Sequence, residues 1–113
     1  MITIWHNPRC SKSRQALALL EERGAQVQVR RYLDDAPSAG ELRLTRDTLN
    51  LRAIEMMRTG EAAFKELGLS KSDDDETLIA AMAANPKLIE RPVVFANGQA
   101  RIGRPPEKVL EIL

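Results

Sequence analysis

The single cysteine of the chain, Cys10, lies between a predicted buried strand over residues 2–6 and a predicted amphipathic helix that begins at Ser11. The first turn of a helix carries free backbone N–H groups and the positive end of the helix dipole, and both favour an anion. An ordinary cysteine is only about 3% thiolate at pH 7, so this position is one way to make a thiol nucleophilic. The alternative is a small, buried, apolar side chain. Four basic side chains flank Cys10 and favour the reactive thiol: His6, Arg9, Lys12 and Arg14.

The helix start alone stabilises an anion by roughly 0.3–1 kcal/mol, so holding Cys10 as a thiolate at neutral pH needs a further positive or hydrogen-bonding group. The nearby residues that could stabilise the thiolate are Lys12, in the first helical turn, and His6, at the end of the strand. His6 would act either as a cation or as a hydrogen-bonding group, and the alternative for this histidine is a packing role. Ser13 stands where a dithiol motif carries its second cysteine, and we group it with Lys12 as supporting the thiolate. Cys-Ser-Lys-Ser cannot close an internal disulfide, so an oxidised or adducted Cys10 requires an external thiol, from glutathione or glutaredoxin.

An oxyanion at Cys10 would need cations from elsewhere in the chain. A phosphatase-type loop places an arginine six residues after the cysteine, and position 16 here is alanine. Arginine binds planar or tetrahedral oxyanions through two parallel N–H donors and keeps its charge. Three arginines are candidates, although each alone is more often a solvated surface residue. They are Arg58, at the end of a predicted helix, and Arg91 and Arg104, each directly before a proline.

The predicted elements follow the order strand, helix, strand, a block of helices, a hairpin and a closing helix. A strand-helix-strand unit pairs its strands in parallel, and Asn97-Gly98 is a strong hairpin signal because both residues tolerate positive φ. We therefore predict one α/β domain over residues 1–113, thioredoxin-like, with a four-stranded mixed sheet and an all-helical insertion between strands 2 and 3. The expected bounds are a strand at 2–6, a helix from 11 closed by Gly24, a strand at 27–32, helices within about 38–87, a hairpin at 93–102 and a helix at 107–113.

Two polar clusters are predicted to cap helices. Ser38 and Glu41 have the spacing of a capping box. The acidic run at 72–76 opens a further helix and complements its dipole, which we favour over a metal or partner site. One cysteine and one histidine cannot furnish an ordinary zinc site, so we predict no metal.

The composition sets further bounds. The chain has 113 residues, 43% of them hydrophobic and 29% charged, with a net charge of +1, which fits one compact domain. Scattered basic residues and only four aromatic side chains do not indicate nucleic-acid binding. No apolar run approaches the ~20 residues of a membrane span, and no signal-peptide pattern precedes the first strand. We expect a cytoplasmic monomer that does not bind membranes.

Several segments resemble the glutaredoxin-coupled arsenate reductase family, the ArsC type. The similarity begins at His6-Asn7-Pro8-Arg9-Cys10, ends with the tail at 103–113, and is collinear over nearly the whole chain. It includes Tyr32-Leu33 and residues 58–69 and 85–92. The best-defined members follow the cysteine with Gly and then Thr or Ser. Cys-Ser-Lys-Ser is therefore similar to an arsenate-reductase-like subgroup that shares the scaffold.

The resemblance implies a thioredoxin-like fold and a reduction of arsenate to arsenite that uses glutathione as co-substrate and no bound cofactor. Cys10 would attack arsenate, and His6 would help to hold the cysteine as a thiolate. Glutathione would attack the adduct, and glutaredoxin with a second glutathione would regenerate the thiol. The oxyanion would be bound by Arg58, Arg91 and Arg104.

Two other functions are compatible with the same scaffold. A monothiol redox protein would form mixed disulfides with glutathione and have no role in arsenic chemistry. An Spx-like transcriptional regulator would bind RNA polymerase. Ser13 argues against a redox switch of the Spx type, because such switches carry Cys-x-x-Cys, and disulfide exchange alone does not need three arginines. Arsenate reduction is therefore the leading hypothesis.

Overall fold

The computed structural model describes residues 1–113 and divides into two compact units. The sheet unit comprises Met1–Asp35 and Arg91–Leu113, and the helical unit comprises Ala36–Glu90. The sheet unit contains β1 (Ile2–Trp5), α1 (Ser11–Glu22), β2 (Val27–Arg30), β3 (Val93–Ala96), β4 (Gln99–Ile102) and the 3-10 helix η3 (Pro106–Ile112). The helical unit contains α2 (Ala39–Leu49), the 3-10 helix η1 (Ala53–Met56), α3 (Ala62–Glu66), α4 (Asp75–Ala84) and the 3-10 helix η2 (Pro86–Leu88).

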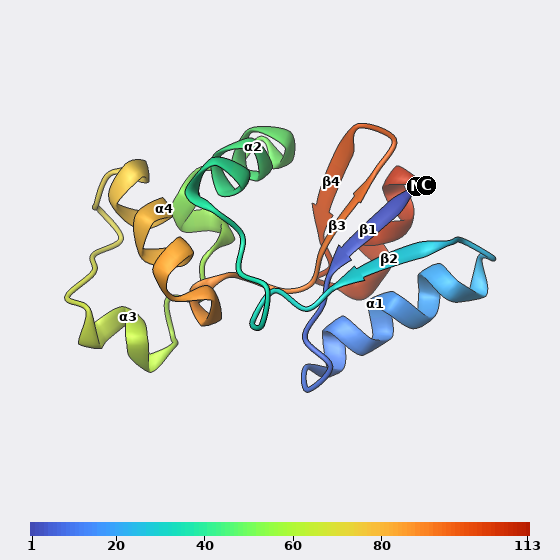
Figure 1. The fold of residues 1–113 in the computed structure, drawn as a ribbon, viewed down its shortest axis with the longest axis horizontal. Helices are drawn as coiled ribbons and strands as arrows, with labels where there is room; N and C mark the ends of the chain where they lie inside the picture. Colours follow the sequence, from blue (N-terminus) through green and yellow to red (C-terminus); the bar gives the residue numbers. More distant parts are fainter. The chain divides into compact units, whose positions relative to one another are not determined.

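The four strands form one mixed sheet in the order β2-β1-β3-β4 (Figure 1). β1 pairs in parallel with β2 and antiparallel with β3, and β3 pairs antiparallel with β4. Every helix of the helical unit falls between β2 and β3 in the sequence. The predicted fold class is confirmed: α/β and thioredoxin-like, with an all-helical insertion between strands 2 and 3.

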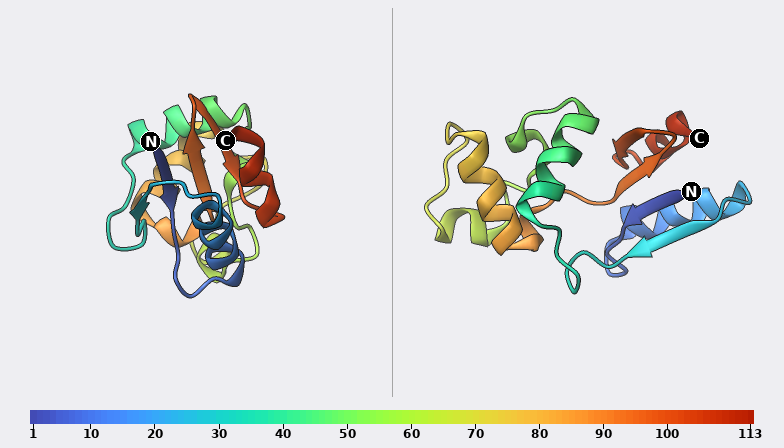
Figure 2. Two further views of the ribbon diagram at one scale, coloured as in Figure 1. Left: turned by 90° about the vertical axis from the view of Figure 1, so that its right-hand side faces the viewer. Right: turned by 45° about the horizontal axis from the view of Figure 1, so that its top comes forward.

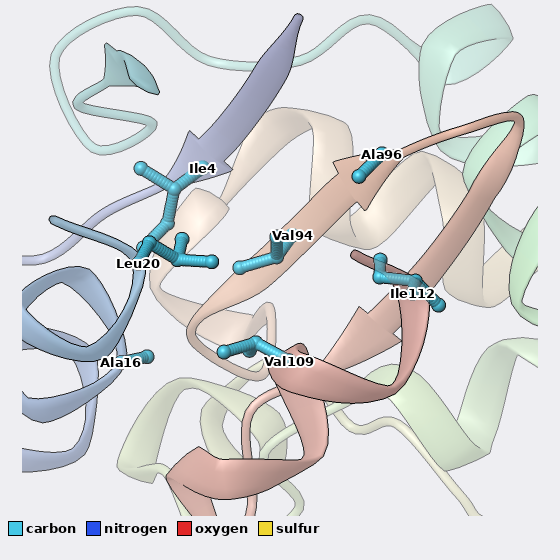
Figure 3. Close-up of a cluster of buried hydrophobic side chains, with 7 residues drawn as sticks. All are labelled: Ile4, Ala16, Leu20, Val94, Ala96, Val109 and Ile112. Carbon is cyan, nitrogen blue, oxygen red and sulfur yellow. The ribbon is translucent and has the colours of Figure 1, made fainter. Parts of the chain in front are cut away.

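The core of the sheet unit lies between the sheet and the helices α1 and η3 (Figure 3). Ile4 on β1 and Val94 on β3 face each other in register and are fully buried. Burial of an aliphatic side chain contributes roughly 1.5–3 kcal/mol, so this cluster holds α1 and η3 against the sheet. The cluster consists of Ile4, Ala16, Leu20, Val94, Ala96, Val109 and Ile112.

Both chain termini lie at the amino end of β1 (Figure 2). Met1 and Leu113 line one shallow depression there. The loop that carries Cys10 follows the other end of β1, so the termini are remote from the thiol. None of the helices has the length and apolar composition that a membrane crossing requires.

The hairpin turn between β3 and β4 has the predicted geometry. Asn97 and Gly98 have φ of 53° and 73°, and two successive positive φ angles are typical of a type I′ turn. The Asn97 amide also donates a 2.9 Å hydrogen bond from Nδ2 to the carbonyl of Ile112, which ties the turn to the end of η3.

Both predicted caps of the helical unit are present. The Ser38 Oγ accepts from the Glu41 backbone N–H at 3.1 Å, and the Glu41 carboxylate accepts from the Ser38 N–H at 3.0 Å, which completes the capping box of α2. Asp74 caps α4 by accepting from the Thr77 N–H at 2.8 Å. The acidic run thus acts at a helix start, as its position in the sequence indicates.

Three element predictions were wrong in detail. The closing segment is the 3-10 helix η3, and its three buried residues, Pro106, Val109 and Ile112, recur every third residue, which is the repeat of a helix with three residues per turn. The predicted helix that ends at Arg58 is the short 3-10 helix η1, after which Met57 forms a β-bridge with Ile89. The strand predicted at 27–32 ends at Arg30, and Val29 is 45% exposed because β2 is an edge strand.

Candidate active site around Cys10

Cys10 is the N-cap residue of α1. Its backbone is extended (φ −94°, ψ 123°), and its carbonyl accepts the first helical hydrogen bond, from the Arg14 N–H at 3.0 Å. The side chain makes no capping hydrogen bond. The thiol therefore sits at the helix end that carries free N–H groups and positive partial charge. It is 8% exposed, so an anion on the sulfur is largely screened from water.

Asn7 organises the loop between β1 and Cys10 through three of its polar groups. Its carbonyl accepts from the Cys10 N–H at 3.0 Å, and its side-chain Oδ1 accepts from the Arg9 N–H at 3.0 Å. Its own N–H donates to the Ser13 Oγ at 3.0 Å. The Arg14 guanidinium donates from Nη1 to the Pro8 carbonyl at 2.9 Å, so one flanking cation holds the loop.

Arg104 brings a guanidinium to the thiol from the far end of the sequence. Its Nη2 donates to the Cys10 Sγ at 3.7 Å, and its Nε donates to the Arg91 carbonyl at 3.0 Å. The segments that carry the two arginines lie at the start of β3 and just after β4, which are antiparallel neighbours. Both Arg-Pro peptide bonds, before Pro92 and before Pro105, are cis.

His6 is held beside the loop in its neutral form. The pKa of His6 lies below its ordinary value, first because the ring is buried and then because the positive charges of Arg31 and Arg14 oppose its protonation. Glu21 acts in the opposite direction and is the smallest contribution. Of the two roles predicted for His6, a cation beside the thiol is therefore disfavoured at neutral pH.

Ser13 is fully buried and bonds to His6 rather than to the sulfur. Its Oγ lies 2.6 Å from the His6 Nδ1 and accepts from the Asn7 N–H. The hydroxyl has one hydrogen and two lone pairs, so while accepting from Asn7 it can also form the hydrogen bond with either neutral tautomer of His6. The bond therefore ties the imidazole to the Cys10 loop in both tautomers.

A model of the ArsC family matches residues 5–112. The chain belongs to the ArsC family. Escherichia coli (strain K12) YfgD, described as uncharacterized, is 53% identical over 114 residues, which cover 99% of this chain and 96% of YfgD. A protein named arsenate reductase from Neisseria meningitidis (strain MC58) is 48% identical, over 99% of this chain and 97% of its own length. The solved structure of an arsenate reductase from Vibrio cholerae has a TM-score of 0.95 and 54% identity, covering 99% and 97% of the two chains.

The sheet unit of this ArsC-family chain brings together most of the predicted site residues. Cys10 and Arg104 are in contact, and Arg91 is bonded to Arg104 through its carbonyl. Lys12 is exposed on the first turn of α1. Arg58 belongs to the helical unit, where its Nη1 forms a 2.8 Å ion pair with the Glu61 carboxylate.

Sequence reasoning did not single out Asn7, although it bonds to more of the Cys10 loop than any charged residue there. The available signal was the Asn-Pro pair, because asparagine in a turn bonds to backbone groups close to it in sequence. No group of three or more histidine, cysteine, aspartate or glutamate side chains is arranged to hold a metal ion.

Proposed function

We propose that this ArsC-family chain is an arsenate reductase that uses Cys10 as its nucleophile and glutathione and glutaredoxin as thiol donors. One observation carries the proposal: the Arg104 guanidinium lies 3.7 Å from a cysteine sulfur at the start of α1. Relatives at 48% identity and 99% coverage of this chain bear the name arsenate reductase, which gives the oxyanion its identity.

In the first step the Cys10 thiolate attacks arsenic, forms an S–As bond and displaces hydroxide. The helix start and Arg104 stabilise the thiolate before attack, and Arg104 with Arg91 binds the arsenate oxygens. Guanidinium groups suit this task because they donate two parallel hydrogen bonds and stay charged. In the proposal, exposed Lys12 adds to the positive charge around the site.

In the second step glutathione attacks the Cys10 sulfur, and the S–As electron pair leaves with arsenic, which becomes arsenite. Each of the two thiols gives one electron, so arsenic(V) becomes arsenic(III) and a Cys10–glutathione disulfide forms. The chain has no second cysteine to resolve this disulfide. Glutaredoxin and a second glutathione reduce it and release oxidised glutathione. The cytoplasm, where glutathione keeps thiols reduced, is the compartment we propose.

His6 and Ser13 act in the proposal by fixing the loop that presents the thiol. Neutral His6 bonds to Ser13, and Ser13 bonds to Asn7, whose carbonyl accepts the Cys10 N–H. A rigid loop keeps the sulfur in the geometry that attack requires, which is the principal way a nucleophile gains effective concentration.

The test is arsenate-dependent oxidation of NADPH in the presence of glutathione, glutaredoxin and glutathione reductase. We expect turnover in the wild type and none in Cys10→Ser. Arg101→Ala is the matched control for arginine variants, because Arg101 is on β4 and is paired with Glu111 at 2.9 Å. Wild-type protein that forms the Cys10–glutathione disulfide without reducing arsenate would refute the proposal. It would favour a monothiol redox protein or an Spx-like regulator.

A further inference from the structure

Gly103 occupies a position in the sheet unit that has no room for a side chain. A Cβ atom there would lie 2.7 Å from Pro92 Cγ, 3.2 Å from Pro92 Cδ and 3.2 Å from Val109 Cγ1. Gly103 is buried and does not have a positive φ, so the requirement is for space and not for an unusual backbone conformation. The Gly103 N–H also donates to the Pro92 carbonyl at 2.9 Å, which holds the two segments at this close approach.

The two segments in contact at Gly103 are those that carry the arginines of the site. Arg91 directly precedes Pro92, and Arg104 directly follows Gly103. The Arg104 Nε donates to the Arg91 carbonyl at 3.0 Å, and its Nη2 reaches the Cys10 Sγ at 3.7 Å. The second contact is already long for a hydrogen bond, so a small displacement of the Arg104 backbone is enough to break it.

We propose that Gly103 is a positioning residue: its missing side chain lets the segment around Arg104 lie on Pro92 and so places the guanidinium on Cys10. Any Cβ at 103 must move the Pro92 ring or the Gly103-Arg104 backbone by about 0.7 Å to restore an ordinary contact of 3.4 Å. Both moves change the position of Arg104 relative to Arg91 and Cys10. The inference rests on the proposed function only in giving Arg104 a role at Cys10.

The experiment compares Gly103→Ala with Gly40→Ala. Gly40 is exposed on α2, and a Cβ there would meet only the Ser38 Oγ, at 3.8 Å, so this variant adds the same methyl group without a clash. Two readouts are taken: arsenate kcat/KM, and the pH dependence of thiolate absorbance, which reports on Cys10 alone because the chain has one cysteine. For Gly103→Ala we expect kcat/KM to fall about 10- to 100-fold and the thiolate to appear at higher pH than in the wild type.

A double-mutant cycle separates positioning from a general structural effect. If Gly103 acts through Arg104, Gly103→Ala changes neither readout further in an Arg104→Ala background. An equal loss with and without Arg104, or a Gly103→Ala variant that behaves like Gly40→Ala, would overturn the proposal. Should Gly103→Ala not fold, the cycle is run in Gly103→Ala/Val109→Ala, which gives the new methyl group room on the η3 side.

The two readouts also separate this inference from the proposed function. Absence of arsenate turnover in the wild type would remove the proposed function, and the thiolate readout would still decide whether Gly103 places Arg104. Normal turnover in the wild type, with a thiolate titration that is the same in Gly103→Ala and Gly40→Ala, would remove the Gly103 inference alone.

Discussion

Replacement of Arg104 by alanine tests the contact on which the site depends. The Arg104 Nη2 lies 3.7 Å from the Cys10 Sγ, and Cys10 is 8% exposed. Two unit charges about 4 Å apart interact by about 1 kcal/mol in water and about 4 kcal/mol near a protein surface. Arg104 is half-buried, so the interaction with a thiolate lies between these limits. A hydrogen bond to a charged group contributes about 1.5–3 kcal/mol, in the same range.

We therefore expect Arg104→Ala to remove about 2 kcal/mol of stabilisation from the Cys10 anion, which corresponds to a roughly 30-fold loss in rate. Two measurements check this: kcat/KM for arsenate in the coupled assay, and the rate of Cys10 alkylation by iodoacetamide at neutral pH. Arg104→Lys keeps the positive charge but lacks the planar guanidinium whose Nε donates to the Arg91 carbonyl. We therefore expect Arg104→Lys to lower the alkylation rate by a smaller factor than it lowers kcat/KM for arsenate.

Arg101→Ala is the control, because it removes an arginine of the same unit that pairs with Glu111. Alkylation of Cys10 at the wild-type rate in Arg104→Ala, in a protein that melts like the wild type, would show that the guanidinium does not stabilise the thiolate. The reasoning from the 3.7 Å contact would then be wrong.

Three further predictions concern stability. Ser13→Ala removes the hydroxyl that bonds both the buried His6 Nδ1 and the Asn7 N–H. We expect the free energy of unfolding, measured in urea, to fall by about 1–3 kcal/mol. An unchanged urea midpoint would contradict this network. Because burial lowers the pKa of His6 in the folded chain, the unfolded chain binds more protons just below the unfolded pKa of about 6.5. Stability should therefore fall as pH decreases from about 6.5 through the folded pKa, and this dependence should be absent in His6→Gln. Ser38→Ala removes the capping box of α2 and should destabilise the chain by about 1 kcal/mol, measured as a lower Tm.

The fold could be predicted because its signals are local. Asn97-Gly98 specifies the hairpin turn by the φ angles that these two residues tolerate, and Ser38 with Glu41 specifies the start of α2 by hydrogen bonds three residues apart. The 3-10 form of η3 was not predictable in this way. It depends on the two core positions that its side chains fill, which are set by the sheet and by α1.

The nucleophile of the site could be predicted from the sequence, whereas the charges around it were harder to predict. Cys10 could be chosen from its place between a strand and a helix, whereas the contact with Arg104 joins residues 94 positions apart and was expected only from a family resemblance. The neutral state of His6 depends partly on Arg31, which parallel pairing of β2 with β1 brings close; the adjacent Arg30 carbonyl accepts the His6 N–H at 2.8 Å. Such a neighbour has no signature in the sequence around the histidine.

The charges around His6 and Cys10 indicate which groups stabilise an anion on the Cys10 sulfur. Burial, and after it the positive charges of Arg31 and Arg14, lower the pKa of His6, so the imidazole is neutral in the pH range where a thiolate would be used. A neutral ring cannot supply the positive charge, which leaves the start of α1 and the Arg104 guanidinium. The helix dipole and a guanidinium are both permanent sources of positive charge. We infer that the site relies on fixed charges, with His6 serving the geometry of the loop, and the reactivity of Cys10 should therefore not require a protonated histidine.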